Sequence, residues 1–144
     1  MSELKREMRF TFSRDLFEQI EKFEVRDLQF FQFLNERRIF IRERMENNRG
    51  AFRKINLILE EKKLNIKTKI LNAKDEKGKN LYSNDKQRDA ALLENVLNDE
   101  EYQKNEKLIE TLNFDYEDFK VAESIVKEYI RFYHTAHYNC GCDS

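Results

Sequence analysis

Apolar residues of this chain fall into two long series with heptad spacing, separated by a polar stretch. Such spacing places one apolar stripe along each helix, and we call the stripe positions the seam. The first seam is Phe31, Leu34, Arg38, Ile41, Met45, Asn48, Phe52, Ile55, Leu59, Lys62 and Ile66, and it is interrupted by the polar residues Arg38, Asn48 and Lys62. The second is Ile109, Leu112, Tyr116, Phe119, Glu123, Val126, Ile130 and Tyr133. The pattern predicts an all-α fold, a long helical hairpin with coiled-coil-like packing, a short extra helix and an N-terminal extended arm.

The predicted boundaries follow from the polar segments between these series. Met8, Phe10 and Phe12 alternate with polar residues, which is typical of an extended arm, and Ser13 or Asp15 then offers a helix N-cap. A continuous helix from Asp15 to Leu71 would follow, with residues 47–50 as its weakest point. The single predicted domain consists of an arm (1–14), a long helical arm (15–73), a connector (74–85), a second helical arm (86–138) and a Cys tail (139–144).

Two further N-caps are predicted in the second half. Ser83 or Asn84 precedes the short helix that carries Leu92 and Val96, and residues 98–101 resemble a capping box. The chain is therefore expected to leave one helix and enter the next near Asn98.

The composition agrees with long helices, because the chain has no proline, three glycines and 38% charged residues. The net charge is only −1, but the charges are unevenly distributed. Seven basic residues lie in 37–54 and seven lysines in 62–79, whereas 94–123 holds ten acidic residues. Either the two arms attract each other across the hairpin, or the basic arm is a functional face.

The apolar stripes are wider than one partner helix can cover, since Phe30, Phe31, Phe33 and Phe40 spread around more than one face. This width favours a homo-oligomer. A compact four-helix bundle, with corners at Gly50 and Asn98, is the competing fold.

Several common catalytic motifs are absent from the sequence. The chain has no glycine-rich phosphate loop, no nucleophile elbow and no Ser/His/Asp arrangement, so we expect no enzymatic activity. No apolar run reaches the length of a membrane span and the first residues resemble no signal peptide, so we expect a cytoplasmic protein without membrane contact.

Both histidines and both cysteines lie within nine residues, at His134, His137, Cys140 and Cys142. Imidazole and thiolate groups are ligands of structural zinc, so zinc is the one cofactor that the sequence suggests. Alternatively, the histidines flank the seam at Tyr133 beside two free thiols, or the cysteines form a redox pair.

The basic residues of the first arm are candidates for contacts to a phosphate backbone, with Phe40, Phe52 and Tyr82 as possible platforms for stacking bases. They are Arg37, Arg38, Arg42, Arg44, Arg49, Arg53, Lys54, Lys62, Lys63, Lys67 and Lys69.

Several segments resemble the UvsY family of phage recombination mediators. They are Lys77-Gly-Lys79, Tyr82-Ser-Asn-Asp85, Arg88 to Leu97 with Asp99, and Ile109 to Tyr133. The resemblance covers residues 35–133 and implies a helical hairpin that assembles into rings, binds single-stranded DNA and helps to load a recombinase onto strands coated by single-strand-binding protein. The DNA contacts that it implies are Arg49, Arg53, Lys54, Lys62, Lys63, Lys67, Lys77 and Lys79, and our candidate set adds Arg42.

The sequence thus predicts a non-enzymatic, oligomeric single-stranded DNA-binding protein that mediates recombination or replication. The alternative is a phage-type interaction module, an inhibitor or adaptor, which binds a protein partner through its aromatic helix face and its acidic arm.

Overall fold

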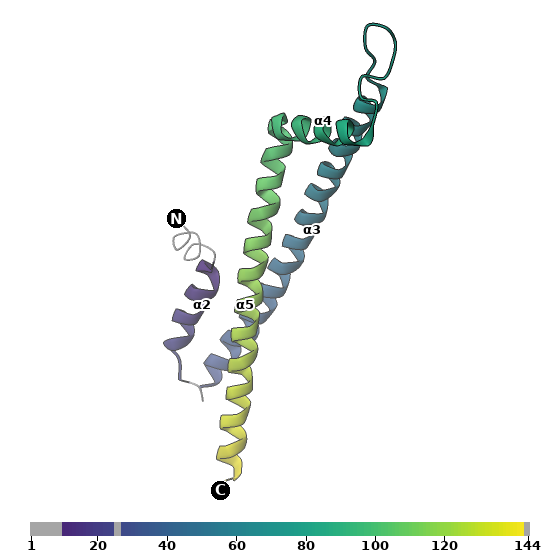
Figure 1. The fold of residues 1–144 in the computed structure, drawn as a ribbon. Helices are drawn as coiled ribbons and strands as arrows, with labels where there is room; N and C mark the ends of the chain where they lie inside the picture. Colours follow the sequence, from purple (N-terminus) through teal and green to yellow (C-terminus); the bar gives the residue numbers. More distant parts are fainter. Residues whose placement is uncertain (1–9, 25–26, 143–144) are drawn as a thin grey trace. The chain divides into compact units, whose positions relative to one another are not determined.

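The computed structural model describes residues 10–24 and 27–142, except for the side chains of 138–142. These residues form four helices: α2 (Thr11–Glu21), α3 (Leu28–Asn72), α4 (Asp85–Asn98) and α5 (Glu100–Cys142) (Figure 1). The prediction of an all-α helical hairpin is confirmed. None of the described helices has an apolar stretch long enough to cross a membrane.

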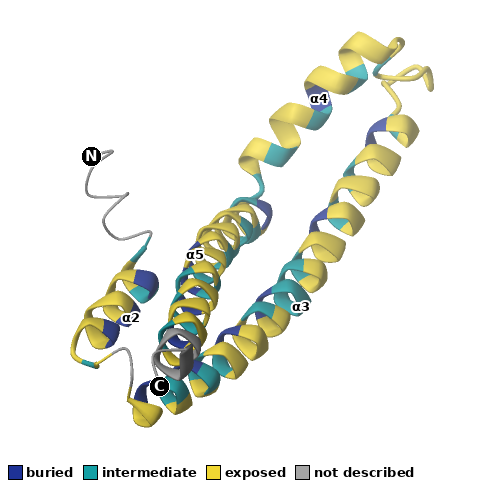
Figure 2. Ribbon diagram, turned by 90° about the horizontal axis from the view of Figure 1, so that it is seen from below, coloured by how far each residue is buried: buried dark blue, intermediate teal, exposed yellow. Residues whose placement is uncertain are grey.

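The chain divides into two compact units, which we call unit 1 (Met1–Gly50 with Leu112–Ser144) and unit 2 (Ala51–Thr111). In unit 1, α3 and α5 are antiparallel, because Phe31 stacks on Tyr133 at 4.5 Å between ring centroids whereas Asn48 reaches Leu112. Buried residues follow the facing sides of these helices (Figure 2). Every predicted seam position is buried or half-buried except Arg38, which is exposed.

α2 supplies a third layer to unit 1. Its Leu16 and Ile20 are buried in one cluster with Phe30, Leu34 and Ile41 of α3 and with Ala122 and Val126 of α5. Phe12 packs edge-to-face on Phe119 at 5.2 Å, and Phe23 contacts Phe30 and Phe33. The wide aromatic surface that suggested an oligomer is thus largely covered within the chain itself.

The amino end of α2 is capped by a side chain from α5. Both oxygens of the buried Asp118 carboxylate accept backbone N–H groups of α2, from Phe12 and from Ser13, at 2.9 Å each. The predicted cap at Ser13 or Asp15 is therefore wrong, and Ser13 Oγ instead donates to the Phe10 carbonyl at 3.1 Å. The helix begins at Thr11, so the expected extended arm is also wrong over 11–14, while Met8 lies outside the described residues.

The predicted continuous helix from Asp15 to Leu71 is wrong at one place. The chain leaves α2 after Glu21 and enters α3 at Leu28, where the Asp27 carboxylate accepts the N–H of Gln29 at 2.9 Å. By contrast, α3 runs through Gly50 without interruption. The Asp27 carboxylate therefore caps the start of α3. Gly50 does not end the helix, because a single glycine weakens a helix by only about 1 kcal/mol.

A polar pair interrupts the apolar seam of unit 1. The buried Asn48 donates from Nδ2 to the carbonyl oxygen of Leu112 at 2.9 Å, and the Arg49 guanidinium lies over the Tyr116 ring at 3.7 Å from its centroid. Because a buried amide needs a partner, this contact favours one alignment of α3 against α5.

Unit 2 has a smaller core, in which Leu59, Ile70, Ala91 and Tyr102 are buried. Its connector turns at Gly78, whose φ of 79° suits glycine, and the Asp75 carboxylate accepts two backbone N–H groups within the turn.

The predicted cap of α4 is confirmed. The predicted helix boundary near Asn98 is confirmed too, but the capping box over 98–101 is wrong, because Asp99 is the cap and the Glu101 side chain pairs with Lys62. Asn84 caps α4 by accepting from Gln87 N at 2.9 Å, and the Gln87 side chain accepts in return from Ser83 N. Asp99 caps α5 by accepting from Tyr102 N at 2.9 Å.

Asp118→Ala removes the acceptor of two amides at the start of α2. We expect the free energy of unfolding to fall by about 2 kcal/mol, the loss typical of a helix cap with a charged, buried acceptor. Urea denaturation followed by circular dichroism measures this change. Glu117→Ala, at an exposed neighbouring position, is the matched control, and an equal loss in both variants would contradict the assigned cap.

Candidate nucleic-acid interface

Three of the candidate DNA-binding residues have partners within their own unit. Arg42 forms an ion pair with Glu123 at 3.4 Å, Arg49 stacks on Tyr116, and Lys62 contacts two carboxylates. For Arg42 and Lys62, the predicted attraction between the basic and acidic arms describes the structure, whereas the partner of Arg49 is an aromatic ring.

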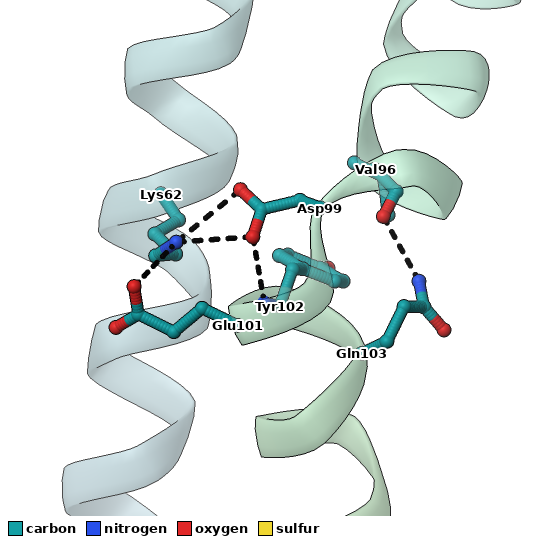
Figure 3. A network of polar contacts seen from close by, with 6 residues as sticks. All are labelled: Lys62, Val96, Asp99, Glu101, Tyr102 and Gln103. Atoms are coloured by element: carbon teal, nitrogen blue, oxygen red, sulfur yellow. Dashed lines mark hydrogen bonds and ion pairs between the residues drawn. The ribbon is translucent and has the colours of Figure 1, made fainter.

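Lys62 lies at the centre of a polar network in unit 2 (Figure 3). Its Nζ lies 3.2 Å from both Asp99 oxygens and 3.0 Å from a Glu101 oxygen. The backbone N–H of Tyr102, and then the Lys62 ammonium, hold the pKa of Asp99 below its ordinary value of 3.8. Glu101 is the main reason that the pKa of Lys62 is raised, and Asp99 contributes to the same shift.

The other six candidates are exposed: Arg53, Lys54, Lys63 and Lys67 on α3, and Lys77 and Lys79 in the connector. No ion pair among the described residues involves any of them. Lys63 and Lys67 are one helical turn apart and therefore point to the same side of α3. These cations remain available to an external anion.

The aromatic candidates differ in their surroundings. Phe40 packs on Phe12 at 6.0 Å between centroids, and the guanidinium groups of Arg37 and Arg44 cover its ring at 5.8 and 5.0 Å. Phe52 is half-buried on α3. Phe40 therefore serves the packing of unit 1, and two guanidinium groups already lie over its ring.

The half-buried Tyr82 is better placed, because it lines an open pocket of about 320 Å³ within unit 2. The pocket is formed by α3, the connector and α4, and its lining includes Lys69, Asn95 and Asp99. Asn95 donates from Nδ2 to the Ala91 carbonyl at 2.7 Å. Tyr82 was a candidate from the sequence, but the pocket beside it could not be predicted, because its lining residues are up to 33 positions apart in the chain.

The two histidines of the predicted zinc set lie beside the end of the aromatic seam. His134 contacts the Phe31 ring edge-to-face at 5.4 Å, and the His137 ring lies 4.2 Å from that of Tyr133. The side chains of Cys140 and Cys142 lie outside the described residues. Among the side chains that the structure describes, no three His, Cys, Asp or Glu residues gather as metal ligands do.

Lys62→Met tests the electrostatic network. Removing the ammonium should raise the pKa of Asp99, but not above 3.8, because the Tyr102 N–H, its larger cause, remains. Since this pKa is depressed in the fold, its stabilising contribution is present above pH 3.8 and is lost as the pH falls through the folded-state pKa. Carboxyl NMR titration measures the shift. Lys63→Met is the control, and a pKa unchanged in Lys62→Met would contradict the contact.

Elemental analysis tests the zinc set. If the two histidines and two cysteines bind zinc together, protein purified under reducing, chelator-free conditions should contain about one zinc per chain. His134→Ala should then lose it. A content below about 0.1 zinc per chain would exclude this site.

Comparison with known proteins leaves the family of this chain open. No protein-family model, no curated protein and no solved structure matches it. The resemblance to UvsY mediators therefore stays a prediction, and the function has to be inferred from the residues of the chain itself.

Proposed function

We propose that this protein is a non-enzymatic, oligomeric single-stranded DNA-binding protein that acts as a mediator of recombination or replication in the cytoplasm. The observation that carries the proposal is the group of six exposed cations on α3 and the connector, which we call the basic face. It consists of Arg53, Lys54, Lys63, Lys67, Lys77 and Lys79.

The basic face suits a polyanion. Residues 53–79 contain nine basic and four acidic residues, and one of the nine, Lys62, is paired with α5. Long, exposed side chains follow a phosphate backbone without demanding a base sequence, and the release of counterions makes such binding sensitive to salt.

Tyr82 supports a preference for single strands. Its ring borders a groove that also holds Lys69, so a base could stack there while a neighbouring phosphate meets an ammonium group. In a duplex the bases are already stacked on each other, and this platform would have nothing to bind.

A mediator role adds protein partners to DNA binding. A recombinase or a single-strand-binding protein is the partner that the UvsY resemblance implies. Several copies of the chain would turn a modest basic face into a strong collective field along one strand.

The second candidate is a protein-interaction module, favoured by the exposed leucines of unit 2. Leu57, Leu64, Leu93 and Leu97 are all more than 60% exposed. The aromatic face expected to bind a partner is a weaker part of this candidate, because Phe30 is buried and Phe31, Phe33 and Phe40 are half-buried in unit 1.

Arg53→Gln with Lys54→Gln tests the basic face. For labelled single-stranded DNA, we expect the dissociation constant to rise about tenfold or more at low salt. The slope of log K against log salt should become shallower by about 1.4, because two phosphate contacts are lost. Fluorescence anisotropy over a salt series measures both quantities.

Lys104→Gln with Lys107→Gln is the matched control, since it removes two exposed cations from α5 instead. Equal weakening by both pairs would show that net charge alone governs binding and would contradict the assigned face. An unchanged affinity in the Arg53/Lys54 variant would do the same. If the parent protein binds no DNA at low salt, the interaction module becomes the leading candidate.

A further inference from the structure

We infer that a second copy of this chain packs antiparallel against α3 of unit 2 through Leu57, Leu64 and Leu71. The inference assigns a surface and a geometry to the proposed oligomer. It rests on that part of the proposed function and not on DNA binding.

The three leucines lie on one line along α3, on the side away from its buried residues, and Leu71 lies at the edge of α4. They are spaced by seven residues, and their side chains are 64%, 63% and 55% exposed. The inward side of the same helix is occupied separately by Leu59 and Ile70, which are buried, and by the half-buried Ile55 and Ile66. In this part of the molecule, α3 therefore has two apolar stripes. The inward stripe packs within the chain, whereas in the outer stripe only Leu71 borders another described helix, at a pocket of about 190 Å³ that it lines with Arg88 and Leu92 of α4.

A seven-residue repeat is the spacing that keeps apolar side chains facing another helix. An isolated helix drifts by only about 20° per heptad, so Leu57, Leu64 and Leu71 stay within one narrow stripe. Burying a leucine is worth roughly 1.5–3 kcal/mol, which makes an uncovered stripe of three a site of association.

The charges beside the stripe indicate that its occupant is a second copy. With a two-fold axis at Leu64, an antiparallel copy places Leu64 against Leu64 and Leu57 against Leu71 of the second copy. On one flank, Glu60 then lies near Lys67 of the second copy, and symmetry makes this pair twice. Glu60 and Lys67 form no ion pair with other described residues. Glu60 accepts one long hydrogen bond from Asn56 at 3.4 Å, and Lys67 borders α4, so both charges can still meet across the proposed contact.

A parallel copy fits less well. It would bring Glu60 beside Glu61 of the second copy, and like charges at such positions oppose association. The stripe and its flanking charges are therefore self-complementary in the antiparallel direction only.

Cysteine cross-linking tests both the contact and its direction. In a full-length chain with Cys140→Ser and Cys142→Ser, Leu64→Cys should form a disulfide-linked dimer under mild oxidation. Leu57→Cys alone and Leu71→Cys alone should not, whereas a mixture of these two variants should cross-link, because residues 57 and 71 face each other. Leu93→Cys, an equally exposed leucine on α4, is the control for random collision.

Each outcome has one meaning. Cross-linking of Leu57→Cys with itself would overturn the antiparallel geometry in favour of a parallel pair. A Leu64→Cys yield no greater than that of Leu93→Cys would overturn the contact.

Solution mass provides an independent readout without engineered cysteines. Leu64→Gln should weaken self-association by about tenfold or more in analytical ultracentrifugation, whereas Leu93→Gln should leave it unchanged. Circular dichroism should show the same helix content in both variants, because each replaced side chain is exposed.

The DNA assay separates this inference from the proposed function. Arg53→Gln with Lys54→Gln should leave the cross-linking of Leu64→Cys intact while it weakens DNA binding. If the Leu64→Cys protein binds DNA but does not cross-link, the interface is overturned and the DNA-binding proposal stands. Retained cross-linking in a protein that binds no DNA would overturn the DNA-binding proposal alone.

Discussion

The contact between the buried Asp118 carboxylate and the first turn of α2 determines how unit 1 closes. A helix N-terminus has amide groups without partners, and here a carboxylate from α5 satisfies two of them. The contact fixes α2 where Leu16 and Ile20 can cover the apolar surface of α3 and α5. This covers the apolar surface of α3 in unit 1. The exposed leucines of α3 that follow a heptad repeat, Leu57, Leu64 and Leu71, therefore all lie in unit 2.

The fold was largely predictable because its main signals are local in the sequence. Heptad spacing identified both seams, and Asn84 could be recognised as a cap since it bonds an amide three residues ahead. The polar residues 98–101 located the boundary before α5, although the acceptor proved to be Asp99. The start of α2 could not be found in this way. Its acceptor, Asp118, lies 105 residues beyond Ser13, and no neighbouring residue signals the contact. The break before α3 was missed because Asp27 sits inside an apolar pattern that continues on both sides.

The candidate site was only partly predictable for a related reason. Composition showed that basic and acidic segments oppose each other, but it did not show which cations are neutralised. In unit 1, Arg42 of α3 meets Glu123 of α5. In unit 2, Lys62 meets Asp99, the cap of α5, whereas its neighbour Lys63 points to solvent. Two adjacent lysines thus differ in whether they can bind an external anion, because they lie on different sides of the helix.

The tertiary contacts also order the folding of the chain. Lys62 and Asp99 are separated by 37 residues, Asn48 and Leu112 by 64, and Ser13 and Asp118 by 105, so each contact encloses the one before it. Because the entropy lost on closing a loop grows with its length, the hairpin should zip from the connector outwards, with α2 docking last. The amides of α2 should then be the first helical amides to exchange with solvent in native-state hydrogen exchange. Helix α2 would be a late-forming foldon, and unit 2 would nucleate the fold.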